Sequence, residues 1–303
     1  MTEPPGVPPV GVRVPASTAN LGPGFDSFGI ALGLHLEAHV VVRRGEEPRV
    51  ATVGEGSEEL PGDDENLLWR SFLALCAHVG APVPDVGIRV HNGIALERGL
   101  GSSSAAIVAG LGLARAAVAA TLSDLELVRL ATEIEGHPDN VAPAVLGGLV
   151  VAARTDGGEL VVRRAQPHPR LCAVVLVPES RQATVAARAS IPASLDRAQV
   201  VDQTARAGHV IGALLGAWPA EAALVGDRLH EPARFEVMGP SGAVVGALRE
   251  GGIHAWLSGA GPSVCAAVPR RDAGAVELCG TIGEEHGFAA SVRDWDLSGL
   301  TLS

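Results

Sequence analysis

The residues with the clearest chemical meaning in this chain are a short run of glycine and serine, Gly99–Ser104, which leads into an alanine-rich stretch. Glycine lets the backbone approach an anion, and the N–H groups of a helix's first turn point toward it. The run therefore predicts a phosphate-binding loop at a helix N-terminus. Because the 303 residues contain no lysine, the nucleotide-binding pattern GxxxxGK[ST] is excluded. If this loop holds ATP, the phosphate charge must be met by backbone amides, serine hydroxyls, a metal ion and arginine.

Two further glycine-containing segments accompany this loop. The segment 15–26 reads PASTANLGPGFD and brings Asn20 and Asp26 around a Gly-Pro-Gly turn, and the segment 257–263 reads LSGAGPS. Taken alone, the Gly99–Ser104 loop could be an ordinary strand-to-helix turn with a serine N-cap, and the other two could be simple turns. Three such segments in one chain favour a shared binding site.

Composition narrows the class of protein. The formal net charge is −11 and 47% of the residues are hydrophobic, which favours a compact globular protein and argues against nucleic acid or an anionic membrane surface as a partner. The four cysteines show no CxxC spacing, so we expect reduced, mostly buried thiols. The sequence shows neither a signal peptide nor an apolar run of about 18 residues, and we therefore expect a cytoplasmic protein.

Hydrophobic periodicity and turn signals predict the elements that must position these loops. A proline-rich tail is expected over 1–9. Strands are predicted at 10–14, ending at Pro15, and at 35–43, 86–90, 147–153, 159–163, 171–177 and twice within 253–268. Helices are predicted at 66–79, after the Gly99–Ser104 loop, from a Ser123/Glu126 capping box to Pro138, and at 198–216, 219–229, 241–250 and 271–286.

The order of these elements predicts a fold class and a division of the chain. Strands and helices are mixed without a regular alternation, which favours an α+β architecture over a doubly wound sheet. Gly110 and Gly112 lie inside a predicted helix, where glycine is unfavourable, and indicate that another backbone approaches closely. A change of composition at 166–169 (QPHP) marks the expected boundary between an N-terminal domain, 10–167, and a C-terminal domain, 168–303.

Together the three glycine-containing segments resemble the GHMP superfamily of small-molecule kinases, named for galactokinase, homoserine kinase, mevalonate kinase and phosphomevalonate kinase. The motifs have the same order and similar spacing, and the resemblance covers about 10–290. Within the superfamily, four segments are most similar in sequence to the homoserine kinases. They are 15–32 (PASTANLGPGFDSFGIAL), 135–148 (EGHPDNVAPAVLGG), 230–234 (HEPAR) and 257–264 (LSGAGPSV). The resemblance implies an N-terminal domain of the ribosomal-protein S5 type, a ferredoxin-like C-terminal domain, and an active site between them.

The resemblance also implies ATP and Mg²⁺ as cofactors, and a set of residues that bind them. The ATP-binding positions are Asn66, Arg98, Gly99, Leu100, Gly101, Ser102, Ser103 and Ser104. In the superfamily a loop serine and an acidic residue hold the metal, and Ser103 (or Ser102) and Glu135 match them, with Glu133 as an alternative. Asn66 matches a position that contacts adenine, but it could equally be the N-cap of the predicted helix 66–79.

The implied substrate is L-homoserine, an amino-acid alcohol with an ammonium, a carboxylate and a hydroxyl group. The substrate-binding positions are Asn20, Asp26, His137, Asn140, Thr184, Arg188, Arg234 and Gly259. Asp26 suits the ammonium, Asn20 and Asn140 suit the region of the hydroxyl, and Arg188 and Arg234 suit the carboxylate, because a guanidinium binds a carboxylate with two parallel hydrogen bonds. The catalytic groups implied by the match are Glu135, Ser103 and Asn140.

The chain departs from the family pattern at two places. The proline that usually precedes the phosphate loop is absent from 94–96 (IAL), and 184–188 reads TVAAR where the family has TKEAR. Sister kinases place an aspartate over the acceptor hydroxyl with a lysine nearby, whereas homoserine kinases are thought to work without a dedicated base. We therefore predict that no general base is indispensable, Asp139 included.

The predicted function is ATP-dependent phosphorylation of L-homoserine to O-phospho-L-homoserine, on the way to threonine. One alternative keeps the fold and changes the acceptor to another small alcohol, such as mevalonate. A sugar is disfavoured because it offers no charge for Asp26 and the two arginines to meet. Another alternative, a non-catalytic small-molecule-binding relative, is disfavoured by the intact loop serines and Glu135. A homodimer is compatible with the sequence, which does not fix the oligomeric state or any feedback by threonine.

Overall fold

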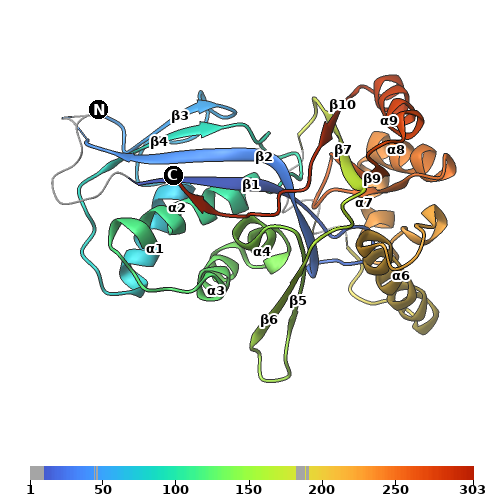
Figure 1. The fold of residues 1–303 in the computed structure, drawn as a ribbon, viewed down its shortest axis with the longest axis horizontal. Helices are drawn as coiled ribbons and strands as arrows, with labels where there is room; N and C mark the ends of the chain where they lie inside the picture. The colour runs from blue at the N-terminus through green and yellow to red at the C-terminus, as the bar shows by residue number, and fades with distance from the viewer. Residues whose placement is uncertain (1–9, 44, 46, 182–187, 189–190) are drawn as a thin grey trace.

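A computed structural model describes residues 10–43, 45, 47–181, 188 and 191–303 of the chain. These residues form two lobes, each built on one β-sheet with helices packed against it (Figure 1). Both described ends of the chain lie in the lobe that contains the larger sheet. The mixture of sheets and helices confirms the predicted α+β class.

The first lobe contains a mostly antiparallel sheet in the order β11-β1-β2-β4-β3, with β5 and β6 continuing from one end of β2. Its strands are β1 (Gly11–Ala19), β2 (Phe28–Val41), β3 (Val50–Gly54), β4 (Gly87–Asn92), β5 (Leu149–Arg154), β6 (Leu160–Ala165) and β11 (Thr301–Leu302). The long β2 pairs with β1 along its length, with β4 through its second half and with β5 at its start. The ends of β1 and β2 near the second lobe therefore carry the first glycine-containing segment between them.

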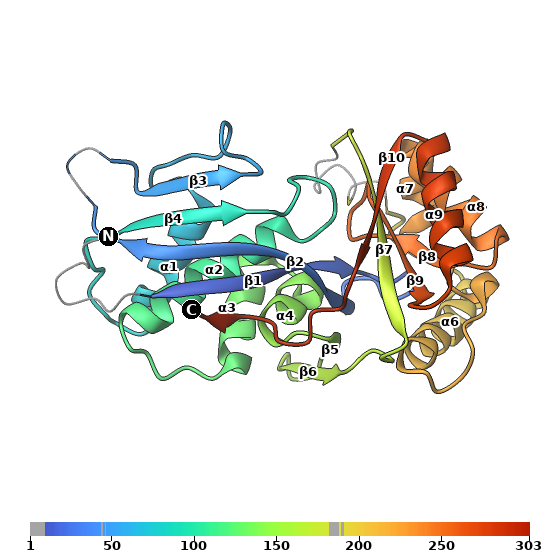
Figure 2. The ribbon, with the colours of Figure 1, turned by 45° about the horizontal axis from the view of Figure 1, so that its top comes forward.

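Four helices lie on one face of this sheet (Figure 2). They are α1 (Leu67–His78), α2 (Ser102–Ala117), α3 (Asp124–Glu135) and α4 (Pro138–Leu146). A Cβ at Gly110 would lie 2.1 Å from the Leu68 carbonyl oxygen of α1, so the expected close approach of another backbone to α2 is confirmed at this position. The tight packing holds the N-terminus of α2 in a fixed place.

The second lobe contains an antiparallel sheet in the order β10-β7-β9-β8. Its elements are β7 (Leu171–Pro178), α6 (Arg197–Leu215), the 3₁₀ turn η1 (Ala222–Leu224), α7 (Glu231–Val237), α8 (Gly239–Glu250), β8 (His254–Leu257), β9 (Val264–Pro269), α9 (Ala273–Glu285) and β10 (Phe288–Arg293). Alternate residues of β7 face opposite ways, as strand geometry requires. Val174 packs with α8 and α9, whereas Val175 belongs to the large core cluster of the first lobe.

Four predicted elements were wrong in type or extent. The strand expected over 35–43 is the second half of the longer β2, Phe28–Val41. The strand expected to end at Pro15 continues to Ala19, because the pairing of β1 with β2 shifts register between Pro15 and Ala16 and so accommodates the proline. The helix expected over 219–229 is only η1, and the next α-helix begins at Glu231. Pro138 does not end α3: that helix ends at Glu135 and is capped by Gly136, whose φ is +96°, and Pro138 begins α4.

The end of the chain returns to the first sheet, which sequence patterns did not predict. Leu32 pairs with Trp295, and β11 pairs with β1. The predicted boundary at 167/168 lies in the connection between β6 and β7. We propose that the segment from Trp295 onward belongs with the N-terminal domain, because its backbone partners lie there.

Two expectations about composition can be compared with the structure. The four cysteines are free and buried, as expected. Within the described part of the chain, every helix is too short or too polar to cross a membrane.

Candidate active site

A cavity of about 610 Å³ lies where the two lobes meet, within the size range of small-molecule sites. It is lined by most of the predicted site residues, which come from both lobes: Asn20, Asp26, Asn66, Arg98, Gly99, Leu100, Gly101, Ser102, Ser103, Glu135, His137, Asn140, Arg188, Arg234 and Gly259. Ser104 is fully buried behind the cavity wall. Thr184 falls outside the described residues.

The phosphate loop is held by the other two glycine-containing segments. Gly99 and Gly101 have φ values of +73° and +69°, a region that favours glycine. A Cβ at Gly99 would lie 2.1 Å from the Ser258 carbonyl oxygen, and one at Gly101 would lie 2.2 Å from Ser17 Oγ. Ser258 Oγ also donates to the Gly99 carbonyl at 2.7 Å. The three segments therefore form one continuous site.

The loop serines and Glu135 form a cluster of oxygen atoms. Ser103 Oγ and Ser104 Oγ donate to Glu135 Oε1 at 2.8 Å and 2.7 Å. The alternative ligand Glu133 is exposed and does not line the cavity, which favours Glu135. Ser102 and Ser103 both line the cavity, so the geometry leaves both serines as candidates.

These residues fit the two groups that the resemblance implies. The N-cap residue of α2 is Gly101, which has no side chain that could bond to the amides of the first turn. These amides and the positive end of the helix form a suitable anion site. Hydroxyl and carboxylate oxygens are the donors that Mg²⁺ prefers. The arrangement can therefore hold a metal–phosphate group without a lysine.

Two of the predicted ATP-binding side chains are bonded within the protein. Asn66 is the N-cap of α1, and its Oδ1 accepts from the amides of Leu68 and Trp69 at 3.0 Å and 3.4 Å. This confirms the capping alternative, while the adenine contact stays a prediction. Arg98 donates to the carbonyl oxygens of Pro178 and Glu179 at 2.8 Å and 2.7 Å, and so ties the entry to the phosphate loop to the second lobe.

Among the predicted substrate-binding residues, Asp26 and Arg188 form an ion pair. The two guanidinium NH groups of Arg188 donate to the two carboxylate oxygens of Asp26, each at 2.8 Å. Both side chains are partly exposed. Asp26 was predicted to bind the substrate ammonium and Arg188 the substrate carboxylate. In the structure these two residues instead bind each other.

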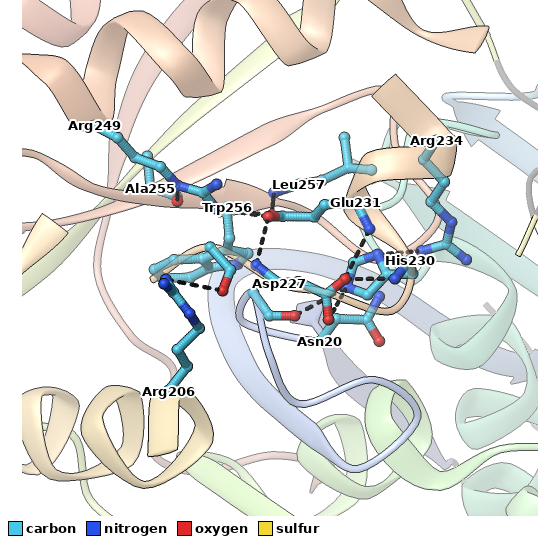
Figure 3. Close-up of polar contacts among 12 residues, drawn as sticks. Asn20, Arg206, Asp227, His230, Glu231, Arg234, Arg249, Ala255, Trp256 and Leu257 are labelled. Carbon is cyan, nitrogen blue, oxygen red and sulfur yellow. Dashed lines mark hydrogen bonds and ion pairs between the residues drawn. The ribbon is translucent and has the colours of Figure 1, made fainter. Parts of the chain in front are cut away.

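Arg234 is a buried cation at the cavity wall, only 2% exposed (Figure 3). Burial and the neighbouring Arg188 lower the pKa of Arg234 to about 10, so it keeps its charge at neutral pH. Arg234 and Asn20 both donate to the Gly259 carbonyl, at 2.8 Å and 2.9 Å. This carbonyl joins α7 to the first and third glycine-containing segments.

The remaining polar wall of the cavity comes from the start of α4. His137 Nδ1 lies 2.6 Å from Asp139 Oδ1. Burial opposes the charged ring, but the hydrogen bond and charge of Asp139, together with the charges of Glu135 and Asp26, outweigh burial and raise the pKa of His137. Asn140 Oδ1 accepts from Ser17 Oγ at 2.9 Å, which fixes the amide orientation. Asp26, His137 and Asp139 lie close enough to one another to form a cluster of potential ligands.

Sequence analysis missed several residues that support the site. Thr18 Oγ1 accepts from Trp256 Nε1 and Ser258 Oγ, both at 2.9 Å, and so joins β1 to the third segment. Thr18 and Ser258 both lie in the glycine-containing segments, so their place in these segments could have marked them as supporting residues. Arg181 and Glu59 pair at 2.6 Å across the cavity lining, and nothing in the sequence links residues so far apart.

Known proteins agree with the class of protein that this fold and site define. The GHMP kinase N-terminal domain family matches residues 66–148, and with the phosphate loop between two lobes this defines a small-molecule kinase of the GHMP class. More particularly, the chain belongs to the homoserine kinase family.

Two relatives and one solved structure support this membership. A homoserine kinase of Moorella thermoacetica is 41% identical over 257 residues, covering 84% of this chain and 86% of the relative. One from Streptomyces coelicolor is 42% identical over 298 residues, covering 97% and 94%. The crystal structure of homoserine kinase from Cytophaga hutchinsonii superposes with a TM-score of 0.83 at 25% identity, covering all of both chains.

Proposed function

We propose that this protein transfers the γ-phosphoryl group of ATP to the side-chain hydroxyl of L-homoserine, giving ADP and O-phospho-L-homoserine. The observation that carries the proposal is the distribution of charge along one cavity. A lysine-free anion loop with Ser103 and Glu135 lines one part of the cavity, called here the phosphate end, and one carboxylate with two guanidinium groups, Asp26 with Arg188 and Arg234, lines another part, called the acceptor end. A phosphate donor and a zwitterionic acceptor suit these two ends.

At the phosphate end, the amides of the Gly99–Ser104 loop would hold the phosphate oxygens. Ser103 and Glu135, which already share a hydrogen bond, would hold Mg²⁺. When bound, the metal supplies charge neutralisation for the transferring phosphoryl group, and positioning and electrostatics provide most of the catalysis of such transfers. Asn66, at the start of α1, would lie beside the base of the nucleotide.

At the acceptor end, binding would exchange ion pairs. The substrate ammonium would take the place of Arg188 at Asp26, and the substrate carboxylate would take the place of Asp26 at Arg188, with Arg234 as its second cation. A ligand with only one of these charges would leave a charge of the Asp26–Arg188 pair without its partner, which is unfavourable in a partly buried site. The pair would thus select for zwitterions over sugars or hydroxy acids.

The hydroxyl would lie near Asn140, whose amide is fixed by Ser17. Asp139 is buried and bonded to His137, so it is engaged within the protein instead of standing unpaired over the hydroxyl. We therefore keep the prediction that no general base is indispensable. The hydroxyl proton would leave with solvent or with a phosphate oxygen.

The proposal is tested by following ADP release from purified protein with ATP, Mg²⁺ and a set of acceptors. L-Homoserine should stimulate ADP release, whereas mevalonate and galactose should not. 3-Aminopropan-1-ol and 4-hydroxybutanoate, which each lack one charge, should be poor acceptors. Activity with mevalonate and none with L-homoserine would overturn the acceptor assignment, and no activity with any alcohol would favour a binding protein.

A further inference from the structure

The beginning of α7 contains a fully buried histidine that the reaction as described so far does not use. His230 is 0% exposed and lies between Arg234 and the loop that follows β1 (Figure 3). Its Nδ1 is 3.1 Å from a guanidinium nitrogen of Arg234, and its Nε2 is 2.9 Å from the Gly22 carbonyl oxygen. One ring therefore touches the cation proposed to bind the substrate and the segment that carries Asn20 and Asp26.

The partners of the ring fix its protonation state. A guanidinium has only donors, so Nδ1 must accept, and a carbonyl only accepts, so Nε2 must carry the proton. The ring is then neutral with its proton on Nε2. This agrees with burial and the nearby Arg234 lowering the pKa of His230 in spite of Asp227 and Glu231. A protonated ring would present N–H to the guanidinium and lose this contact.

Two buried carboxylates, Asp227 before α7 and Glu231 in its first turn, hold the backbone that carries the ring (Figure 3). Asp227 Oδ2 accepts from the backbone amides of Leu229 and Glu231, as well as from that of His230. Glu231 accepts from Arg249 at 2.9 Å and from the amide of Leu257 at 3.2 Å. These bonds fix the first turn of α7 against β8 and so fix the ring relative to Arg234.

We propose that His230 is a positioning residue, which holds the guanidinium of Arg234 in its orientation for the substrate carboxylate through the unprotonated Nδ1. The proposal rests on the proposed function only in taking the carboxylate of L-homoserine as the ligand of Arg234. It assigns to His230 a role in acceptor affinity without contact with either substrate. In this role the ring of His230 transfers no proton.

The first test uses two substitutions that each keep one ring contact. In His230→Asn the side-chain oxygen can take the position of Nδ1 and accept from Arg234, whereas in His230→Gln the amide reaches the position of Nε2 and bonds only to Gly22. We expect His230→Gln to raise the KM for L-homoserine by about tenfold to a hundredfold, as for a lost hydrogen bond to a charged group. The KM for ATP should change little, and His230→Asn should restore most of the affinity.

The matched control is His254→Gln in β8, another buried histidine, which packs edge-on against the ring of Trp256. It should lower the melting temperature without a change in the KM for L-homoserine. A double-mutant cycle adds a further constraint: in an Arg234→Leu background, His230→Gln should have no further effect on this KM. Equal effects of His230→Gln in both backgrounds, or of His230→Asn and His230→Gln, would overturn the proposal.

A measurement on the wild-type protein decides the question even if the variants do not fold. In ¹⁵N-histidine-labelled protein, the ring of His230 should show a protonated Nε2 and an unprotonated Nδ1 throughout the neutral pH range. An imidazolium, or a proton on Nδ1, would contradict the proposal. This spectrum needs no substrate, so a wrong prediction for the His230 ring can be told apart from a wrong proposed function. The second would appear as a wild-type protein that does not phosphorylate L-homoserine.

Discussion

At the residue scale, the site contains a few charges in a protein with a net charge of −11. Arg234 is the most buried of its cations and donates to the Gly259 carbonyl. Ser103 and Ser104 both donate to one oxygen of Glu135. Such buried or bonded groups are already oriented before a ligand binds, which lowers the cost of ordering them on binding.

Replacement of Arg234 by leucine should raise the KM for L-homoserine by about a hundredfold or more, because an unpaired carboxylate would be left in a buried site. The KM for ATP should stay within a few-fold of the wild-type value. Steady-state kinetics with each substrate varied in turn measures both constants. Arg228→Leu is the control, because Arg228 pairs with Asp202 and is 40% exposed. A selective rise in the KM for ATP would show that Arg234 belongs to the nucleotide subsite and that its assignment to the acceptor is wrong.

Replacement of Asp139 by asparagine should leave kcat within about tenfold of the wild-type value, whereas loss of a true general base costs about 10²- to 10⁴-fold. The amide can still bond to His137, so the start of α4 should stay intact. Single-turnover rates and nucleotide binding should be measured together. Complete loss of transfer with unchanged nucleotide binding would show that Asp139 is the base.

At the scale of elements, the phosphate end depends on how α2 begins. The loop before α2 contacts the first segment through Ser17 and the third through Ser258, and α2 itself packs tightly on α1. The element therefore presents its N-terminus to the cavity with little freedom to move. Precise positioning of this kind is what phosphoryl transfer requires.

Replacement of Gly99 by alanine should weaken ATP binding more than L-homoserine binding and should lower the melting temperature. The residue has a φ of +73°, and the added Cβ would meet the Ser258 carbonyl oxygen at 2.1 Å. Calorimetric titration with a non-hydrolysable ATP analogue and thermal denaturation measure the two effects. Gly208→Ala in α6 is the control, since a Cβ there meets nothing within 4 Å and should stabilise the helix slightly. Unchanged nucleotide affinity in Gly99→Ala would exclude the loop from the ATP site.

The elements also show what local patterns can predict. Helix α1 was predicted closely, because its apolar periodicity and its N-cap, Asn66, both lie within one continuous stretch of sequence. The early end of β1 at Pro15 was wrong because pairing with β2 continues past the proline. The helix expected at 219–229 was wrong because only the short turn η1 forms there. The ion pair of Asp26 with Arg188 joins residues 162 apart. Both residues line the same cavity, but no pattern in the sequence indicated that they bind each other.

At the scale of the whole molecule, the chain crosses between the lobes more than once. It leaves the first lobe after β6, builds the second sheet, and returns after β10 to pair β11 with β1. His35 Nε2 of β2 donates a hydrogen bond to Asp296 Oδ2 of the returning segment at 2.8 Å, and both side chains are mostly buried. Hydrogen bonds from His35 and two backbone amides outweigh burial and lower the pKa of Asp296.

Replacement of Asp296 by asparagine should reduce the free energy of unfolding by about 1–3 kcal/mol at pH 7. Because the pKa of Asp296 is lowered in the folded state, its contribution is present above the unfolded pKa of about 4 and is lost as the pH falls further. The difference from wild type should therefore shrink at about pH 3, as measured by urea denaturation. Asp85→Asn, which removes an exposed partner of Arg49, should have little effect at either pH. If Asp296→Asn lowered the free energy of unfolding more at about pH 3 than at pH 7, this interpretation would be contradicted.

The most direct test of the central claim is phosphorus NMR of a reaction with ATP, Mg²⁺ and L-homoserine. The account predicts that each ATP consumed gives one ADP and one phosphomonoester, with the phosphorus coupled to the protons of the carbon that carries the homoserine hydroxyl. Release of inorganic phosphate without this ester, or ATP left intact, would contradict it.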